Sequence, residues 1–377
     1  MSNSNETYLV ITPFFPSNQS FVGSYIYDQV VEINKQTDYN IKIVKISSIF
    51  SNEQDYHYQG FDVFIFKLID FPFFIFPGIF DSMNRIRFRN FLRRKGINNI
   101  KFAHGHVTYP ASYLLSIFRC NTIIQHHGLD VLQLMNGRST IIRKLQRNYL
   151  IRRSIKRLNI IDLNVGVSNK FINNLLSFQK DYCFNHVVLY NGVDLDKFKY
   201  KKQSDNNIFT IGCIGNFWEI KDQITLIKSI KLLKDQGVEV LGRFIGSGDK
   251  LKNCKNFVEE NNLRKNISFE DEMDHKYLNN FYNSIDLFVL PSYFEALGCV
   301  YLESWATHTP FIAVKGQGIE ELIPDCLKGS MLVSKSDPNE LSRKILDIYN
   351  NPMSLKFNDN YGIKHTIREF LSHDIFK

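Results

Sequence analysis

The sequence lacks any pattern of paired or clustered cysteines. Its cysteines are scattered, with no Cys-x-x-Cys spacing and no group of neighbouring histidines, at positions 120, 183, 213, 254, 299 and 326. Disulfide frameworks and zinc sites usually show closely spaced cysteines, or cysteines combined with histidines. The scattered thiols therefore predict neither, and they are typical of a protein that is kept reduced in the cytosol.

Long uninterrupted hydrophobic runs are also missing. The most apolar stretch, residues 63–80, contains Lys67, Asp70, Pro72 and Pro77, and the prolines disfavour a regular helix there. The first residues, MSNSNETY, are polar and lead directly into the strand-like segment YLVIT, so we expect no signal peptide. We therefore predict no membrane-spanning helix and a cytoplasmic location.

Several well-known catalytic and cofactor motifs are absent. The chain has no Gly-x-Ser-x-Gly elbow, no Walker-type phosphate loop and no His-Glu-x-x-His zinc motif. Residues 246–248 read Gly-Ser-Gly and lack the third glycine of a dinucleotide-binding fingerprint. Residues 194–196 read Asp-Leu-Asp, but they lie in a polar turn rather than after a strand of a metal-binding fold. We expect no metal ion and no other cofactor.

Charge is distributed unevenly along the 377 residues, a length that exceeds what one hydrophobic core usually supports and so predicts two domains. Residues 1–200 carry 24 Lys and Arg against 14 Asp and Glu, a net charge of +10. Residues 201–377 carry 22 against 24, a net charge of −2. The positive first half favours an anionic partner. No helix-turn-helix, RNA-recognition or zinc-finger pattern accompanies the charge, so we do not expect nucleic acid.

Much of the positive excess lies in residues 85–95, where arginines alternate with apolar side chains. This segment follows the aromatic run FPFFIFPGIF at 71–80, and a second basic stretch covers residues 138–157. A basic amphipathic segment beside aromatic side chains is typical of a contact with an anionic membrane surface. A surface helix whose apolar side belongs to the core would give the same pattern, and the sequence leaves both interpretations open.

Short apolar runs alternate with helical patterns in both halves of the chain, which predicts strands buried on both faces and intervening helices. The predicted strands are 8–12, 41–46, 61–68, 100–104, 122–127, 163–168, 209–215, 238–246, 267–271, 286–292 and 309–314. The predicted helices are 25–35, 112–119, 222–235, 250–261, 275–284, 302–307 and 338–349. The alternation predicts an α/β fold with two doubly wound parallel sheets, joined near a polar, strand-poor stretch at 194–207.

The most informative segment is PSYFEALGCVYLES, which follows a predicted strand and places Glu295 and Glu303 eight residues apart. In a helix this spacing spans about 12 Å and returns to nearly the same face. Open parallel sheets bind ligands at the carboxyl ends of their strands, so both acids are expected beside a ligand that bears hydroxyl groups. Gly298 lies near the helix start, where backbone N–H groups favour phosphate. A nucleotide-sugar would satisfy all three, although two ordinary solvated glutamates would show the same spacing.

Other candidate ligand residues also follow predicted strands. Gly23 precedes a helix in the loop after the first strand, where a glycine permits either close approach of a ligand or tight packing. The pair His104 and His106, and the segment from His127 to Asp130, follow two later strands. Histidines in such positions can hydrogen-bond sugar hydroxyls.

Lys221 lies in GNFWEIKD, after the first strand of the second half and close to a predicted helix start. Its ammonium group can neutralise a diphosphate there, and the helix dipole acts in the same direction. A lysine at a helix start is usually only solvated, so this interpretation depends on the neighbouring motifs.

In their order, these motifs resemble those of retaining glycosyltransferases of the GT-B fold, in the large family 4 of nucleotide-sugar-dependent enzymes. The resemblance is carried by FAHGHVTYPASYLL, QHHGLDV, VGVSNKF, LYNGVDLDKF, IGNFWEIKD, IGSGD, PSYFEALGCVYLES and GQGIEEL. It implies two Rossmann-like domains facing each other across a cleft. Residues 1–195 would form the acceptor side, with a C-terminal helix at 355–377 packed back on them, and residues 196–354 would bind the donor.

The resemblance also implies roles for individual residues. The implied catalytic residues are His127, Lys221 and Glu295. The implied donor-binding residues are Gly23, Asn216, Lys221, Glu295, Ala296, Leu297, Gly298 and Glu303, with Glu295 on the sugar and Glu303 on the ribose. The acceptor side would include His104, His106 and Asp130.

Two positions depart from the family pattern. Asn216 stands where an arginine is common, so a bidentate phosphate contact is missing. Three outcomes stay open: Arg243 replaces the arginine, another cation replaces it, or the affinity for the donor is low. Gln317 stands where the family's Gly-Gly-x-x-Glu motif has a glycine, and Glu321 fits the acid of that motif better than Glu320.

The implied reaction transfers a sugar from a nucleoside diphosphate sugar to an acceptor hydroxyl with retention of anomeric configuration and without metal. The basic first half suits a lipid-linked glycan of capsular, exopolysaccharide or lipopolysaccharide synthesis, handled by a peripheral enzyme on the inner face of the plasma membrane. Three alternatives remain open: a GT-B nucleotide-sugar epimerase, a non-catalytic nucleotide-sugar-binding homologue, and a purely structural α/β protein.

Overall fold

A computed structural model describes residues 6–70, 78–128, 141–177, 184–201, 208–353 and 355–377. The chain divides into an N-terminal unit of Met1–Asn191 with Lys364–Lys377 and a C-terminal unit of Gly192–Ile363. From the sequence we predicted the first boundary between residues 195 and 196 and the second between residues 354 and 355. The second differs because Trp305 of the C-terminal unit donates a 3.1 Å hydrogen bond from Nε1 to the carbonyl of Lys356 and packs on Phe357, which keeps residues 355–363 with that unit.

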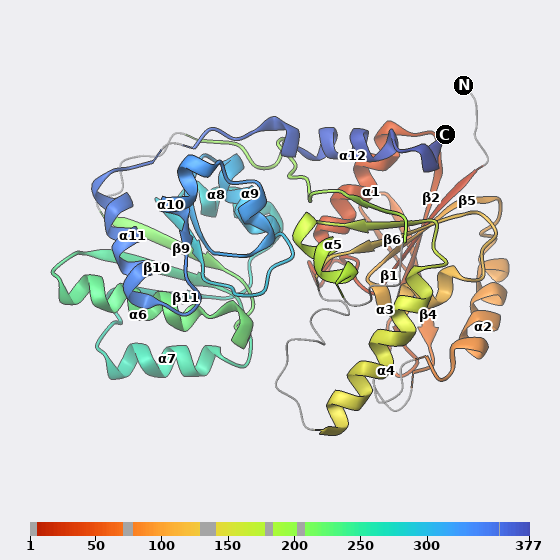
Figure 1. The fold of residues 1–377 in the computed structure, drawn as a ribbon, viewed down its shortest axis with the longest axis horizontal. Coiled ribbons are helices and arrows are strands. Elements are labelled where there is room, and N and C mark those ends of the chain that lie inside the picture. Colours follow the sequence, from red (N-terminus) through yellow and green to blue (C-terminus); the bar gives the residue numbers. More distant parts are fainter. Residues whose placement is uncertain (1–5, 71–77, 129–140, 178–183, 202–207, 354) are drawn as a thin grey trace. The chain divides into compact units, whose positions relative to one another are not determined.

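The N-terminal unit is built on a sheet whose described strands have the order β3-β4-β2-β1-β5-β6-β7-β8 (Figure 1). Every neighbouring pair is parallel except β3 and β4, which are antiparallel. The strands are β1 (Thr7–Thr12), β2 (Asn40–Ser48), β3 (Tyr56–Tyr58), β4 (Phe61–Leu68), β5 (Ile100–His106), β6 (Asn121–His126), β7 (Leu163–Gly166) and β8 (His186–Val188). The central strand β1 is buried along its whole length because its residues are apolar on both faces.

Helices follow these strands and cover the sheet. They are α1 (Ser24–Gln36), α2 (Asp81–Arg94), α3 (Thr108–Leu115), α4 (Ile141–Leu158) and α5 (Asn169–Leu176). The last helix of the chain, α12 (Ile363–Leu371), returns to this unit, where Phe370 lies 5.8 Å from the His104 ring and Phe376 lies 4.8 Å from Phe102. The observed C-terminal helix is therefore shorter than the predicted range of 355–377. Aromatic packing holds it and the residues after it against the N-terminal unit.

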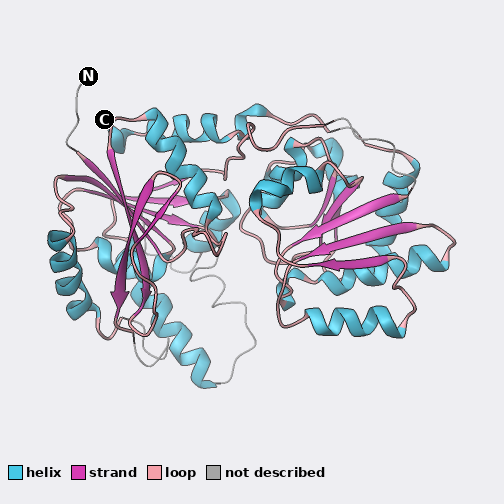
Figure 2. Cartoon of the chain, turned by 180° about the vertical axis from the view of Figure 1, so that it is seen from behind, coloured by secondary structure: helices cyan, strands magenta, loops and turns pink. Residues whose placement is uncertain are grey.

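The C-terminal unit has a fully parallel sheet in the order β11-β10-β9-β12-β13-β14, counted over the described residues. Its strands are β9 (Phe209–Ile214), β10 (Val240–Ile245), β11 (Ile267–Glu270), β12 (Leu287–Leu290), β13 (Phe311–Val314) and β14 (Leu332–Val333). Its helices are α6 (Gln223–Asp235), α7 (Leu251–Glu260), α8 (His275–Tyr282), α9 (Cys299–Ala306), α10 (Asp325–Met331) and α11 (Pro338–Asn350). Figure 2 shows helices on both faces of each sheet.

Both sheets confirm the predicted α/β fold with doubly wound parallel sheets. In each, the chain winds outward in one direction and then returns to wind in the other, so β1 lies beside β5 and β9 lies beside β12. The reversal opens a crevice at the carboxyl ends of these adjacent strands, which is where open α/β sheets bind ligands. Within the described ranges, no helix combines the length and the apolarity that a bilayer crossing would need.

Candidate active site

At the carboxyl edge of the C-terminal sheet, the loops after β9, β12 and β13 are fastened to one another. The carbonyl of Ile220 accepts hydrogen bonds from the Tyr293 N–H at 3.0 Å and the Ser292 hydroxyl at 3.1 Å. The side-chain oxygen of Gln317 accepts one from the Glu295 N–H at 2.9 Å. Three segments that are distant in sequence therefore form one surface at the point where the strand order reverses.

Lys221 and Glu295 form an ion pair on this surface, between Lys221 Nζ and Glu295 Oε1. Their side chains are 20% and 12% exposed, so the pair is largely withdrawn from water but still accessible. The structure thus brings together two residues that the sequence assigned separately to the site. Partial burial strengthens their attraction relative to a fully solvated pair.

Gly298 fixes the start of helix α9 beside this pair. Its φ of 81° lies in the left-handed region, and a Cβ atom there would lie only 2.8 Å from the Tyr301 ring. The Tyr301 hydroxyl donates a 2.8 Å hydrogen bond to the Leu290 carbonyl, which holds the ring against β12. Leu297 is buried and Ala296 is half-buried, so Leu297 can offer a ligand little more than its backbone.

Glu303, on the same helix, is only 7% exposed and has two side-chain partners. The Tyr282 hydroxyl donates to its Oε2 at 2.8 Å, and His275 Nε2 lies 3.2 Å from its Oε1. Burial, and then the negative charge of Glu303, raises the pKa of the Tyr282 hydroxyl well above its usual range. Each carboxylate oxygen keeps a second lone pair that can accept from a ligand. Sequence reasoning missed both partners, because nothing in the spacing connects them to Glu303.

The loop that carries Asn216 is supported from behind by the Gly-Ser-Gly segment. A Cβ atom on Gly246 would lie 2.4 Å from the Gly215 carbonyl oxygen, and one on Gly248 would lie 2.7 Å from that of Phe217. The two glycines are therefore required for close backbone packing, which explains the motif without a dinucleotide. Asn216 itself is exposed.

Arg243, the candidate to replace the missing arginine, already has side-chain partners in the structure. It lies within β10 and makes a bidentate contact with Glu270, at 2.8 and 3.1 Å, and donates a 2.8 Å hydrogen bond to Ser284. Another cation is Lys335, whose ammonium group lies 3.6 Å from the centre of the Tyr293 ring. It was not predicted from the sequence, because it follows the two-residue strand β14.

A row of aromatic and imidazole rings runs along the N-terminal sheet, from Tyr8 near the start of β1 to His127 just after the end of β6. The Tyr8 hydroxyl lies 2.7 Å from His104 Nδ1, and the rings of His104 and His106 stack at 4.3 Å. His106 Nδ1 then lies 2.9 Å from His127 Nε2, and the His127 ring packs 4.8 Å from Tyr25. The structure thus places the predicted residues His104, His106 and His127 in one row of contacting side chains. The last histidine of this row, His127, is half-buried.

The two inner imidazoles of this chain are neutral at physiological pH. Burial, and then the neighbouring His127, lowers the pKa of His104 to about 3. Burial and the adjacent imidazoles also lower the pKa of His106 well below its usual range. In the hydrogen bond between His106 and His127, one ring nitrogen donates and the other accepts, so the two tautomers depend on each other.

The remaining predicted residues have varied positions. Gly23, with a φ of 92°, would bring a Cβ atom to 2.7 Å from the Phe14 backbone, so packing alone requires glycine there. Asp130 lies outside the described residues. Among the residues that are described, no group of three or more His, Cys, Asp or Glu could hold a metal ion.

Comparison with known proteins agrees with this geometry. Residues 194–365 match the family described as Glycosyl transferases group 1. An uncharacterized glycosyltransferase of Methanocaldococcus jannaschii is 28% identical over 281 residues, which cover 73% of this chain and 72% of the relative. The O-antigen chain mannosyltransferase RfbU of Salmonella typhimurium is 23% identical over 269 residues, 71% of each chain. The capsular polysaccharide biosynthesis glycosyltransferase CapM of Staphylococcus aureus is 24% identical over 231 residues, 58% of this chain and 59% of the relative.

Solved structures share the fold. Sucrose-phosphate synthase from Thermosynechococcus elongatus matches with a TM-score of 0.74 at 16% identity, over 97% of this chain and 94% of that one. HepE of Anabaena, in complex with UDP and glucose, matches with a TM-score of 0.67 at 15% identity over the same shares. The chain therefore has the GT-B fold, and residues 194–365, which span most of its C-terminal unit, are similar to the group 1 glycosyl transferases.

Proposed function

We propose that this protein is a retaining glycosyltransferase that transfers a sugar from a nucleoside diphosphate sugar to a hydroxyl of a lipid-linked glycan. The observation that carries the proposal is the Lys221–Glu295 ion pair, held at the carboxyl edge of the C-terminal sheet. Two similar proteins named for O-antigen and capsular polysaccharide synthesis support the acceptor class. A fold neighbour solved with UDP and glucose supports the donor class.

Donor binding would exchange partners at the ion pair. The diphosphate carries more negative charge than a carboxylate, so it competes with Glu295 for the Lys221 ammonium. Once released, the Glu295 carboxylate accepts hydrogen bonds from sugar hydroxyls. The backbone N–H groups at the start of α9 lie beside it and can donate hydrogen bonds to other oxygens of the donor. The resting ion pair therefore keeps both groups correctly placed without leaving either charge unpaired.

Cleavage of the sugar–phosphate bond then places growing negative charge on the diphosphate while the sugar becomes positively charged. Lys221 and the helix dipole of α9 stabilise that charge in a site that is partly shielded from water, so metal is not required. Retention follows if the departing phosphate takes the proton from the acceptor hydroxyl on the same face of the sugar. The acceptor oxygen then forms the new bond at the anomeric carbon.

The N-terminal edge would hold the acceptor near His127. Of the three histidines, His104 and His106 are buried and only His127 is partly exposed, so His127 would exchange hydrogen bonds with the hydroxyl groups of the acceptor. We further propose that the enzyme works as a peripheral protein at the inner face of the plasma membrane, where a lipid-linked acceptor is presented.

A panel of nucleotide-sugars, incubated with the full chain with and without lipid-linked acceptors, tests the proposal. We expect acceptor-dependent release of a nucleoside diphosphate, with a product whose anomeric NMR coupling matches that of the donor. Release of an isomerised sugar without acceptor would instead indicate an epimerase. Binding without turnover would indicate a non-catalytic homologue, and inversion of the anomeric centre would refute the retaining mechanism.

A further inference from the structure

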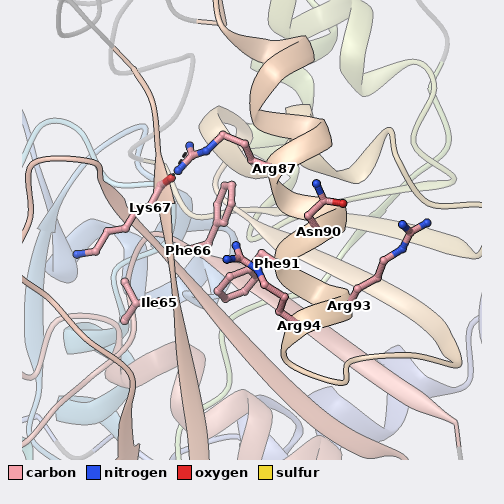
Figure 3. Close-up of a pocket in the computed structure, with 8 residues that line it drawn as sticks. All are labelled: Ile65, Phe66, Lys67, Arg87, Asn90, Phe91, Arg93 and Arg94. Atoms are coloured by element: carbon pink, nitrogen blue, oxygen red, sulfur yellow. Dashed lines mark hydrogen bonds between the residues drawn. The ribbon is translucent and has the colours of Figure 1, made fainter.

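A hollow of about 710 Å³ lies on the N-terminal unit between strand β4 and helix α2. Figure 3 shows the side chains that line it. From β4 these are Ile65, Phe66 and Lys67, and from α2 they are Arg87, Asn90, Phe91, Arg93 and Arg94. Half of the lining residues are cationic and none is acidic, so the hollow favours an anion.

One of the arginines is already oriented by the protein. The Arg87 guanidinium donates to the Lys67 carbonyl at 2.8 Å and to Asn84 at 3.2 Å, and it packs on the face of Phe66 at 5.6 Å (Figure 3). These contacts satisfy only part of its five N–H donors. Burial, and then repulsion from Arg94, lowers the pKa of Arg87, which a bound anion would relieve.

The other two arginines have no acid to neutralise them. The ion pairs at the ends of α2 are made by Arg85 and Lys95, and within the described part of the chain none is made by Arg93 or Arg94. Asp55 approaches β4, where it accepts from the Ile65 N–H, but Lys95 already pairs with it. The hollow therefore keeps an uncompensated positive charge.

Helix α2 also presents apolar side chains to solvent. Its core side is formed by Phe88, Phe91 and Leu92, which are buried as the surface-helix interpretation predicted. A second apolar set lies on the opposite side, where Ile79 just before the helix, Met83 and Ile86 are 58%, 40% and 61% exposed. Their spacing of four and three residues puts them on one face, with Arg93 farther along the same face.

We propose that this surface binds a bilayer that contains anionic phospholipid: the hollow takes the phosphate of a lipid headgroup, and Ile79, Met83 and Ile86 enter the boundary of the acyl chains. Arginine binds phosphate through two parallel hydrogen bonds, which the hollow offers from α2. A helix with arginines beside exposed apolar residues is stable at the interface of a membrane, where each group has a suitable solvent. A soluble phosphate compound or a nucleic acid would leave the three apolar side chains in water.

The inference rests on the proposed membrane-linked acceptor and adds the site and its lipid chemistry. Flotation of the full chain with vesicles tests it, using phosphatidylcholine alone and phosphatidylcholine mixed with phosphatidylglycerol. We expect binding only to the anionic vesicles, reduced about tenfold or more by the double substitution Arg93→Gln and Arg94→Gln. The matched control is Arg152→Gln with Lys156→Gln, two exposed residues of α4, which removes the same charge elsewhere and should change binding less than about threefold.

The contribution of the exposed apolar side chains to vesicle binding is tested with a second pair of target and control variants. Ile86→Ser should weaken vesicle binding about fivefold, whereas Ile160→Ser, at a side chain that is 60% exposed in the same unit, should not. Equal binding to neutral vesicles, or equal losses in target and control variants, would overturn the inference. Arginine-dependent binding of single-stranded RNA without vesicle binding would assign the surface to nucleic acid instead.

The same samples separate this inference from the proposed function. If sugar is transferred to a soluble acceptor analogue but the protein does not float with anionic vesicles, the lipid site is wrong and the enzymatic proposal stands. If the protein floats as expected but releases no nucleoside diphosphate with any donor and acceptor, the enzymatic proposal is wrong. Matched melting temperatures for all variants exclude loss of folding as the cause.

Discussion

Both sheets reverse their strand order beside the first strand of their unit, but the carboxyl ends of their strands carry different groups. In the C-terminal unit the edge holds the Lys221–Glu295 ion pair and the carboxylate of Glu303. In the N-terminal unit, strand β5 carries His104 and His106 towards its carboxyl end, and their lowered pKa values keep them uncharged. The same fold thus carries charged side chains in one unit and buried neutral imidazoles in the other.

The interactions within the C-terminal edge also differ from those within the N-terminal edge. Hydrogen bonds from side chains to backbone groups join the C-terminal loops, through Ser292 and Gln317. Contacts between side-chain rings, both hydrogen-bonded and packed, join the N-terminal residues from Tyr8 to Tyr25. Removing a charge should therefore damage the first edge most, and adding a charge should damage the second edge most.

Loss of the cation at the C-terminal edge should have the largest effect. Lys221→Ala removes the group that neutralises the diphosphate and leaves Glu295 as a partly buried charge without its partner. We expect kcat/KM for sugar transfer to fall by about 10²- to 10³-fold. Initial rates with varied donor measure this, and Lys252→Ala, at an exposed lysine of α7, is the control that should stay near wild type. A loss below about tenfold in Lys221→Ala would contradict a catalytic role.

Addition of charge at the N-terminal edge should have the next largest effect. Because the folded pKa of His104 is about 3 and the unfolded value is about 6.5, the unfolded chain binds more protons in this interval. Stability is therefore complete above about pH 6.5 and is lost as the pH falls towards the folded pKa. For His104 alone we expect a loss of about 2 kcal/mol between about pH 6.5 and pH 5, while carboxylates remain ionised.

Hydrogen exchange of individual peptides measures this loss in each unit. Protection of β1 and β5 should decrease between those pH values more than protection of β9 and β12. In His104→Gln, which cannot become charged, the dependence of the N-terminal unit on pH should be flatter. An unchanged dependence in that variant would mean that other groups cause the loss.

Much of the fold could be predicted from the sequence, because long strands buried on both faces show as continuous apolar runs. The run FDVFIFKL coincides with β4 (Phe61–Leu68), and β1, β2, β9 and β13 were also predicted. The strands β3, β8 and β14 were missed because two or three residues show no periodicity. Helix α9 begins at Cys299 and not at Leu302, since Gly298 alone sets its start through a left-handed backbone.

The site could be predicted only where a motif names the residue. Lys221 and Glu295 were found because both follow strands that end at the same edge. Side-chain partners across long separations leave no such signal, as with Tyr282, which lies 21 residues from Glu303 and binds it. The partner of Arg243 could not be predicted either, because the sequence does not show that Glu270 lies beside it on the neighbouring strand.

Addition of a second cation to the C-terminal edge should make this edge more positive and so strengthen donor binding. Asn216 is exposed in the loop after β9, where the family commonly has arginine. Asn216→Arg should lower the Kd for the nucleotide-sugar about tenfold, because a guanidinium can bind phosphate oxygens in pairs. Isothermal titration measures this. Asn216→Lys, which adds the charge without the fork, should gain less than about threefold, and equal gains would show that only long-range charge matters.

The smallest effect should come from the hydrogen bond that holds the Glu295 loop. Gln317→Met keeps the length of the side chain but removes the oxygen that accepts from the Glu295 N–H. The net contribution of such a hydrogen bond is about 1 kcal/mol. We expect kcat/KM to fall about fivefold with little change in melting temperature, because the bond orients the loop rather than supporting the core. Gln317→Glu retains an acceptor and should keep more activity than Gln317→Met. If Gln317→Met behaved like the wild type, the β13 loop would be a neighbour of the site and not a support for it, and the departure from the family's glycine would have no functional consequence.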